Sequence, residues 1–149
     1  NFKEYSWNDR GSDERNYCSP GIDLPMCTIM RSKFGDYKEY HTSDDNLIKV
    51  VNKKGLNDSF DLISKLHFSA DNFCYPKVKF MGEPFLSKRN MYPHIGTDKL
   101  PKKIMLIKNI LTYSDGSNSV IDIANKCKIP VWEIVPIIND LKKKKLLYV

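Results

Sequence analysis

The chain has 149 residues, of which 41% are hydrophobic and 28% charged, and its formal net charge at pH 7 is +6. This length suits one ordinary domain or two small ones, and this balance of residues excludes wholesale disorder. No apolar run approaches the roughly 20 residues that a membrane span needs, and the polar N-terminus excludes a signal peptide. The sequence begins with Asn1 and not with Met, which suggests a processed chain, a truncated chain or a C-terminal fragment.

The first 43 residues are rich in aromatic residues, Gly and Pro, so we expect them to be mostly loops. Only Gly21 to Arg31 is typical of a strand, and Pro25 inside it favours an edge position. An irregular segment of this length inside a compact domain is often functional.

Two helices are expected between residues 43 and 70. Ser43 and Asp44 provide an N-cap for the first helix, and Gly55 is typical of the residue just after a helix end. The second helix would begin at Asn57 or Asp58. Its apolar face would carry Phe60, Ile63, Leu66 and His67. We therefore expect His67 to lie in a core or an interface.

Residues 76–100 contain three Pro and two Gly, which indicates a tether and not a regular element. Many hydrophobic side chains are interspersed, so we expect the tether to lie against a surface. Residues 101–149 then predict three helices and a short final strand, which is the winged-helix pattern. Pro101 opens the first helix, Ser119 caps the second and Pro130 starts the third, which Pro136 should kink.

Charge accumulates at the C-terminal end, where residues 98–149 hold ten Lys, no Arg and five acidic residues, a net charge of +5. This excess permits contact with nucleic acid without establishing it. The first turn of the third helix, Pro130-Val131-Trp132-Glu133, has no side chain suited to base edges. The run Lys142–Lys145 complements the dipole of the helix end. Nucleic-acid binding is thus disfavoured, and packing on a neighbouring domain or a partner protein is expected.

Four cysteines, at positions 18, 27, 74 and 127, show none of the spacings of a zinc finger or a CxxC motif. Scattered thiols of this kind are typical of a reducing compartment. We expect a cytoplasmic protein with free thiols and no membrane association. Whether it forms a homo-oligomer is left open.

Two polar motifs near the N-terminus could carry chemistry. The stretch Gly11 to Arg15 (GSDER) places two carboxylates before a guanidinium, but it also suits a solvated turn with a weak surface ion pair. His41 lies in Glu39-Tyr40-His41-Thr42, just before an acidic stretch. It could be a metal ligand, or a surface or capping residue. The residues alone leave both readings open.

Taken together, GSDERNYCSPGIDLP (11–25) and MRSKFGDYKEYHTSDDN (30–46) resemble the closing segment of the di-zinc aminopeptidase superfamily, which also includes the glutaminyl cyclases. The greatest similarity is to a bacterial subgroup of aminopeptidase-like proteins, often labelled as polysaccharide biosynthesis proteins. Its members also carry a GEP…KR…YP tether and a C-terminal winged helix, which residues 82–93 and 101–149 resemble. The resemblance spans nearly the whole chain.

The resemblance implies an α/β fold in three parts. Residues 1–75 would be the closing portion of an aminopeptidase-like α/β domain, residues 76–100 the tether and residues 101–149 a small winged-helix domain. His41 would be a zinc ligand and Asp13 a catalytic acid near the metal. The substrate pocket would be lined by Glu14, Arg15, Tyr17 and Tyr40.

In that superfamily, a metal-bound water attacks a peptide or amide carbonyl. The remaining ligands for one or two zinc ions lie upstream of the matched region, so the expected partner is the upstream part of the same catalytic domain. The chain alone is then expected to be inactive. Two alternatives stay open, a winged-helix DNA-binding or regulatory module and an aminopeptidase-like binding protein that has lost catalysis.

Overall fold

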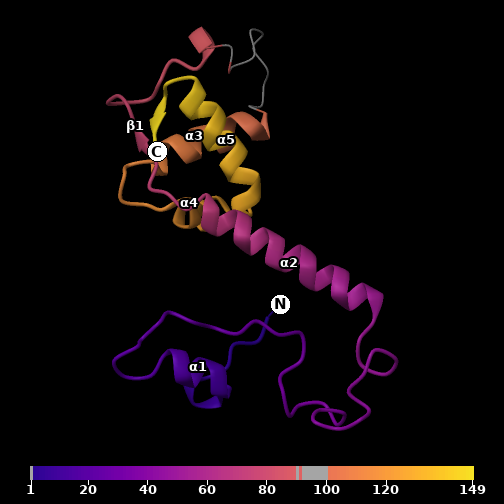
Figure 1. Cartoon of the computed structure of the whole chain (residues 1–149). Coiled ribbons are helices and arrows are strands. Elements are labelled where there is room, and N and C mark those ends of the chain that lie inside the picture. The colour runs from indigo at the N-terminus through magenta and orange to yellow at the C-terminus, as the bar shows by residue number, and fades with distance from the viewer. Residues whose placement is uncertain (1, 90, 92–100) are drawn as a thin grey trace. The chain divides into compact units, whose positions relative to one another are not determined.

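The computed structural model describes residues 2–89, 91 and 101–149, and the chain divides into two compact units, residues 1–59 and 60–149 (Figure 1). Part of the expected tether, including all of 92–100, lies outside the described residues. Within the described part of the chain, no helix combines the length and the hydropathy that a membrane span requires.

The second unit contains three helices, α3 (Lys102–Tyr113), α4 (Val120–Cys127) and α5 (Val131–Lys143). Two short strands, β1 (Lys77–Val78) and β2 (Leu147–Tyr148), pair antiparallel with Val78 opposite Leu147. A single turn of 3-10 helix, η2, covers Ser87–Arg89. Figure 1 shows the three helices gathered together, with β1 and β2 beside them. Three helices and a small two-stranded sheet confirm the winged-helix pattern.

The core of this unit consists of the inward-facing apolar residues of the three helices and β2. Seven of these side chains have 2% or less of their surface exposed: Ile110, Val120, Ile123, Ile134, Ile138, Leu141 and Leu147. Leu86 and Met91, from the segment expected to be a tether, join the same core. Full burial of each large aliphatic side chain contributes about 1.5–3 kcal/mol to the stability of the fold. These residues therefore provide the main hydrophobic stabilisation of this unit.

Helix α4 has defined signals at both ends. The Ser119 hydroxyl accepts a hydrogen bond from the Asp122 N–H, and the Asp122 carboxylate accepts one from the Ser119 N–H, which is a complete capping box. The helix ends at Lys128, whose backbone is left-handed with φ of +55°. The capping role predicted for Ser119 is confirmed.

Helix α5 runs through Pro136 as one continuous helix. Pro136 has no N–H to donate to the Trp132 carbonyl, so one bond of the ladder is missing there. The inward faces on both sides of this position, at Ile134 and Ile138, are buried, and this packing supports the helix across the gap.

The first unit contains two short helices, η1 (Trp7–Asp9) and α1 (Ser12–Tyr17). Helix α1 covers most of the GSDER motif, which the sequence had suggested to be a loop. The start of α2 (Lys53–Asp71) also belongs to this unit, and its remainder belongs to the second. The segment between α1 and α2 consists of turns, bends and irregular chain.

The expected strand at residues 21–31 is not present as a strand. A strand requires a second backbone to pair with, and none of the described strands lies along this segment. Pro25 also removes one donor. The Leu24 N–H instead donates to the Tyr17 carbonyl at 3.0 Å, which ties the segment back to α1.

The boundaries expected for the helices after residue 43 were wrong. Residues 43–50 form turns, because the Asn46 side-chain oxygen accepts the N–H groups of Ile48 and Lys49 and so competes with helical bonding. A single helix, α2, then begins at Lys53 and passes through Gly55. A Cβ at Gly55 would lie 2.5 Å from Nη1 of Arg31, so this glycine permits close packing and does not end a helix.

Candidate functional site

The GSDER motif is held in place by one buried carboxylate. Glu14 is only 6% exposed, and its Oε1 accepts a hydrogen bond from the Thr28 hydroxyl. A Cβ at Gly11 would lie 2.7 Å from the Glu14 Oε2, so the absence of a side chain there lets the carboxylate turn inward. Glu14 therefore fastens α1 to the segment at residues 21–31.

The other three candidates of this motif face outward. The side chains of Asp13, Arg15 and Tyr17 are exposed. Asp13 makes no hydrogen bond or ion pair to any described residue, so its carboxylate is available for a ligand from outside this part of the chain. A catalytic acid and pocket-lining residues need this kind of accessibility.

His41 lies in a turn, with its backbone in the left-handed region at φ of +58°. Its side chain is exposed, and its ring stacks on the ring of Tyr40 with the centroids 4.0 Å apart and the planes 17° apart. Tyr40 in turn contacts the edge of Tyr37 at 5.7 Å and the ring of Phe34 at 6.2 Å. The imidazole is thus the outermost ring of a small aromatic cluster.

Phe34 brings the two motifs near each other. A Cβ at Gly11 would meet a carbon of the Phe34 ring at 3.6 Å, and the same ring contacts Tyr40. The start of α1 and the His41 turn therefore approach the same aromatic ring. Within the described residues, no hydrogen bond or ion pair joins His41 to Asp13.

The two groups that close the His41 turn, Tyr37 and Asp45, were not singled out from the sequence. The Tyr37 hydroxyl donates to the Asp45 carboxylate at 3.0 Å. Partial desolvation and this hydrogen bond raise the pKa of Tyr37 above its ordinary value of 10.0, so the phenol stays protonated and donates throughout the neutral range. The signal that could have found this pair is the placement of a phenol and a carboxylate four residues to either side of His41.

The residues present do not form a zinc site by themselves. A catalytic zinc needs three protein ligands and an open position. Among the described residues, no group of three His, Cys, Asp or Glu side chains is close enough to hold a metal. The exposed imidazole of His41 fits the role of one ligand in a site that other residues would complete.

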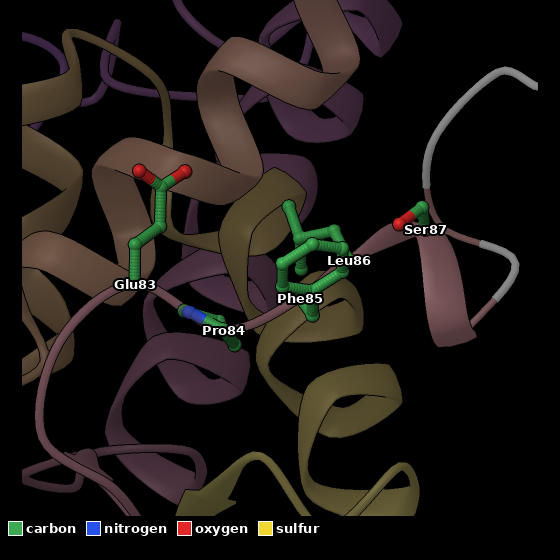
Figure 2. Close-up of a pocket in the computed structure, with 5 residues that line it drawn as sticks. All are labelled: Glu83, Pro84, Phe85, Leu86 and Ser87. Atoms are coloured by element: carbon green, nitrogen blue, oxygen red, sulfur yellow. The ribbon is translucent and has the colours of Figure 1, made fainter.

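Among the depressions formed by the described residues, two lie in the second unit and are lined by no residue of the two motifs. The first, of about 280 Å³, is formed by Glu83–Ser87, which Figure 2 shows as consecutive residues of one stretch. Glu83 pairs there with Lys108 of α3 at 2.7 Å. The second, of about 200 Å³, lies beside Cys74 and Lys142. Burial raises the pKa of the Cys74 thiol, which makes this cysteine a weak nucleophile.

Comparison with known families divides the chain near its middle. Residues 1–73 match a family described as a domain of unknown function (DUF4910). Residues 74–149 match the winged helix-turn-helix family, in agreement with α3, α4, α5 and the small sheet. This chain belongs to the winged helix-turn-helix family. The winged-helix region therefore begins just before β1, whose residues pair with the last strand of the same domain.

Two relatives extend over both regions. A candidate polysaccharide biosynthesis protein with an aminopeptidase-like domain from Clostridium acetobutylicum is 42% identical over 139 residues, which cover 92% of this chain and 32% of the relative. The crystal structure of a candidate peptidase from the same organism is 33% identical with a TM-score of 0.78, covering 94% of this chain and 30% of that one. The chain is therefore similar to about a third of the length of peptidase-like proteins.

Proposed function

We propose that this chain is the closing part of a zinc-dependent, aminopeptidase-like hydrolase that cleaves peptide or amide bonds. The upstream part of the same catalytic domain would be its partner. The observation that carries the proposal is the contrast between the two units. The buried hydrophobic side chains of the described residues all lie between Leu86 and Leu147, so the first unit contributes none of them.

A unit without a core of its own needs a partner surface. Its segment at residues 22–30 exposes five large apolar side chains, each by 36% to 59%: Ile22, Leu24, Met26, Ile29 and Met30. Contiguous exposed apolar surface of this kind marks an interaction site. The exposed apolar side chains support the packing of residues 1–59 on the remainder of a larger catalytic domain.

Helix α2 supports the same conclusion. It is 19 residues long and amphipathic, and its one buried residue is Gly55. Its exposed apolar residues are Leu56, Phe60, Leu62, Ile63, Leu66 and Phe68. His67 is exposed as well, so it does not lie in a core of this chain. An amphipathic helix gains most of its stability from packing of its apolar face, which in this proposal the upstream part of the domain provides.

Within that domain, His41 would supply one zinc ligand, and the other ligands would come from the upstream polypeptide. The accessible carboxylate of Asp13 would act as an acid near the metal. Arg15, Tyr17 and Tyr40 would line the substrate pocket. Glu14, also expected in the pocket, has one carboxylate oxygen engaged by Thr28 and would support the pocket wall from behind.

The proposal is tested with a polypeptide that spans the full length of the relatives, by measuring bound zinc and hydrolysis of aminoacyl amides. His41→Ala is expected to lose at least one zinc ion per chain together with activity. His67→Ala, which removes the exposed imidazole of α2, is the matched control and should retain both. Equal zinc content in the two variants would remove His41 from the ligand set. Zinc binding without hydrolysis would instead favour a binding protein that has lost catalysis.

A second candidate function, nucleic-acid binding, is favoured by the winged-helix family match and the net charge of +5 on residues 98–149. The third helix of such a domain reads bases with its N-terminal residues. In α5 these are Trp132, which lies under the ammonium of Lys65 at 5.3 Å, and the acidic Glu133. Neither is suited to a base edge, so we place this function second.

A further inference from the structure

The backbone of His41 adopts a conformation that its own sequence does not favour. A left-handed conformation is uncommon for residues other than glycine, and it persists where the surroundings enforce it. Here His41 lies inside one turn and directly before a second. The Thr42 N–H donates to the Glu39 carbonyl at 3.0 Å, and the Asp45 N–H donates to the Thr42 carbonyl at 3.1 Å. The position of the His41 Cα is therefore fixed from both sides.

The side chain of His41 is fixed by a different set of contacts. Stacking on Tyr40 uses a face of the imidazole and leaves the two nitrogens, which lie in the ring plane, open. Neither nitrogen makes a hydrogen bond to any described residue. Tyr40 is itself braced by Tyr37 and Phe34. The ring therefore has a defined platform and unused ligand atoms.

The ends of the turn are joined by a side-chain bond. The Tyr37 hydroxyl donates to the Asp45 carboxylate, and Asp44 pairs with Lys49 at 2.7 Å. A bond between residues 37 and 45 closes a short loop, so fewer loop conformations compete with the observed one.

We propose that residues 37–45 form a prebuilt holder for the His41 imidazole, with Tyr40 and Tyr37 as its positioning residues. The ring of Tyr40 is the platform that orients the His41 imidazole. The hydrogen bond between Tyr37 and Asp45 holds this platform in a fixed position relative to the loop backbone. The inference rests on the proposed function, because the group that the imidazole would hold is the zinc ion.

The platform is tested in the polypeptide that spans the full length of the relatives, by comparing Tyr40→Leu with Tyr40→Phe. Tyr40→Leu removes the stacked ring and should weaken zinc binding by about 10- to 100-fold, the usual effect of removing a group that orients a metal ligand. Tyr40→Phe keeps the ring and loses only a hydroxyl that makes no hydrogen bond to the described residues, so it should bind zinc as the wild type does.

The closing bond is tested with Tyr37→Phe, which keeps the edge contact to Tyr40 and removes the hydrogen bond to Asp45. Like Tyr40→Leu, this variant should bind zinc more weakly than the wild type. The matched control is Tyr75→Leu, which disrupts another edge-to-face pair, with Phe73 at 5.4 Å, outside the loop. This control should leave zinc affinity unchanged.

Replacement of zinc by Co²⁺ adds a readout that loss of stability alone would not change. The visible absorption bands of bound Co²⁺ report coordination geometry, and they should shift in Tyr40→Leu and Tyr37→Phe but not in Tyr40→Phe. Wild-type affinity and spectra in both Tyr40→Leu and Tyr37→Phe would overturn the holder, provided that His41→Ala still loses zinc. If His41→Ala retains its zinc, the proposed function itself fails.

Discussion

At the residue scale, Asp115 shows how one carboxylate orders a turn. It accepts the N–H groups of Ser117 at 2.7 Å and Asn118 at 3.0 Å, between α3 and α4. Gly116 supplies the left-handed φ of +88° that the turn needs, and a Cβ there would also meet the Lys77 side chain at 3.1 Å. The Ser114-Asp115-Gly116 turn could be predicted from sequence because these residues act locally.

The backbone hydrogen bonds to Asp115, from Asn118 first and then Ser117, lower its pKa well below the ordinary value of 3.8. A lowered folded pKa contributes stability above the unfolded pKa and loses it as the pH falls toward the folded pKa. Asp115→Asn cannot titrate, so its urea midpoint should fall less than that of the wild type between about pH 5 and about pH 2. Equal losses in both proteins would show that this carboxylate does not contribute to the acid sensitivity.

Lys128 offers a second test at this scale, because it ends α4 in the left-handed conformation that glycine adopts without steric cost. Its side chain is exposed, so replacement removes little packing. Lys128→Gly should raise the free energy of unfolding by about 0.5–1 kcal/mol, as measured by urea denaturation. A lower value in the variant would mean that the lysine side chain stabilises the helix end by more than the strain costs.

At the element scale, helix positions in the winged-helix domain could be predicted because their apolar spacing matches a core that lies in the same unit. The elements before residue 72 were harder to predict. The run around Ile22 has the composition of a strand but no strand to pair with. The side chain of Asn46 holds turns where the N-cap residues Ser43 and Asp44 suggested a helix. The structure of such segments depends on whether a second strand is present to pair with and on local side-chain hydrogen bonds. Neither can be read from the amino-acid composition.

Helix α4 provides a matched pair for testing the core, since Ile123 is fully buried and Ile121, two residues earlier, is 40% exposed. Ile123→Ala should lower the free energy of unfolding by about 2–5 kcal/mol, because it removes buried methyl groups and leaves a cavity. Ile121→Ala should cost less than about 1 kcal/mol. Urea unfolding followed by circular dichroism measures both, and equal losses would contradict the assignment of the inward face.

At the scale of the whole molecule, hydrophobic burial is uneven along the chain. The winged-helix domain carries the buried core of the described residues, whereas residues 1–59 and α2 expose their apolar side chains. The long motifs around Asp13 and His41 allowed a peptidase-like relationship to be predicted from sequence, and the relatives agree with it. The sequence could not show how the His41 ring is held, because ring stacking depends on coordinates.

The charge of the winged-helix domain leads to a prediction for nucleic acid. A protein that neutralises several phosphates loses affinity steeply as salt rises. Because the acidic Glu133 in the first turn of α5 would face the phosphates unfavourably, we expect no shift of random duplex DNA by this chain in a gel at low salt. The control is a basic winged-helix protein of known DNA affinity in the same gel. A salt-dependent shift of this chain would move the nucleic-acid function to first place.

The proposed role of His41 as a zinc ligand is tested most directly by anomalous diffraction at the zinc edge. The crystals would contain a polypeptide that spans the full length of the relatives. The account predicts a zinc peak about 2.0–2.1 Å from a ring nitrogen of His41, with the remaining ligands from upstream residues and the ring of Tyr40 stacked on the imidazole. A structure in which the His41 ring faces solvent, with no metal near it, would contradict the account.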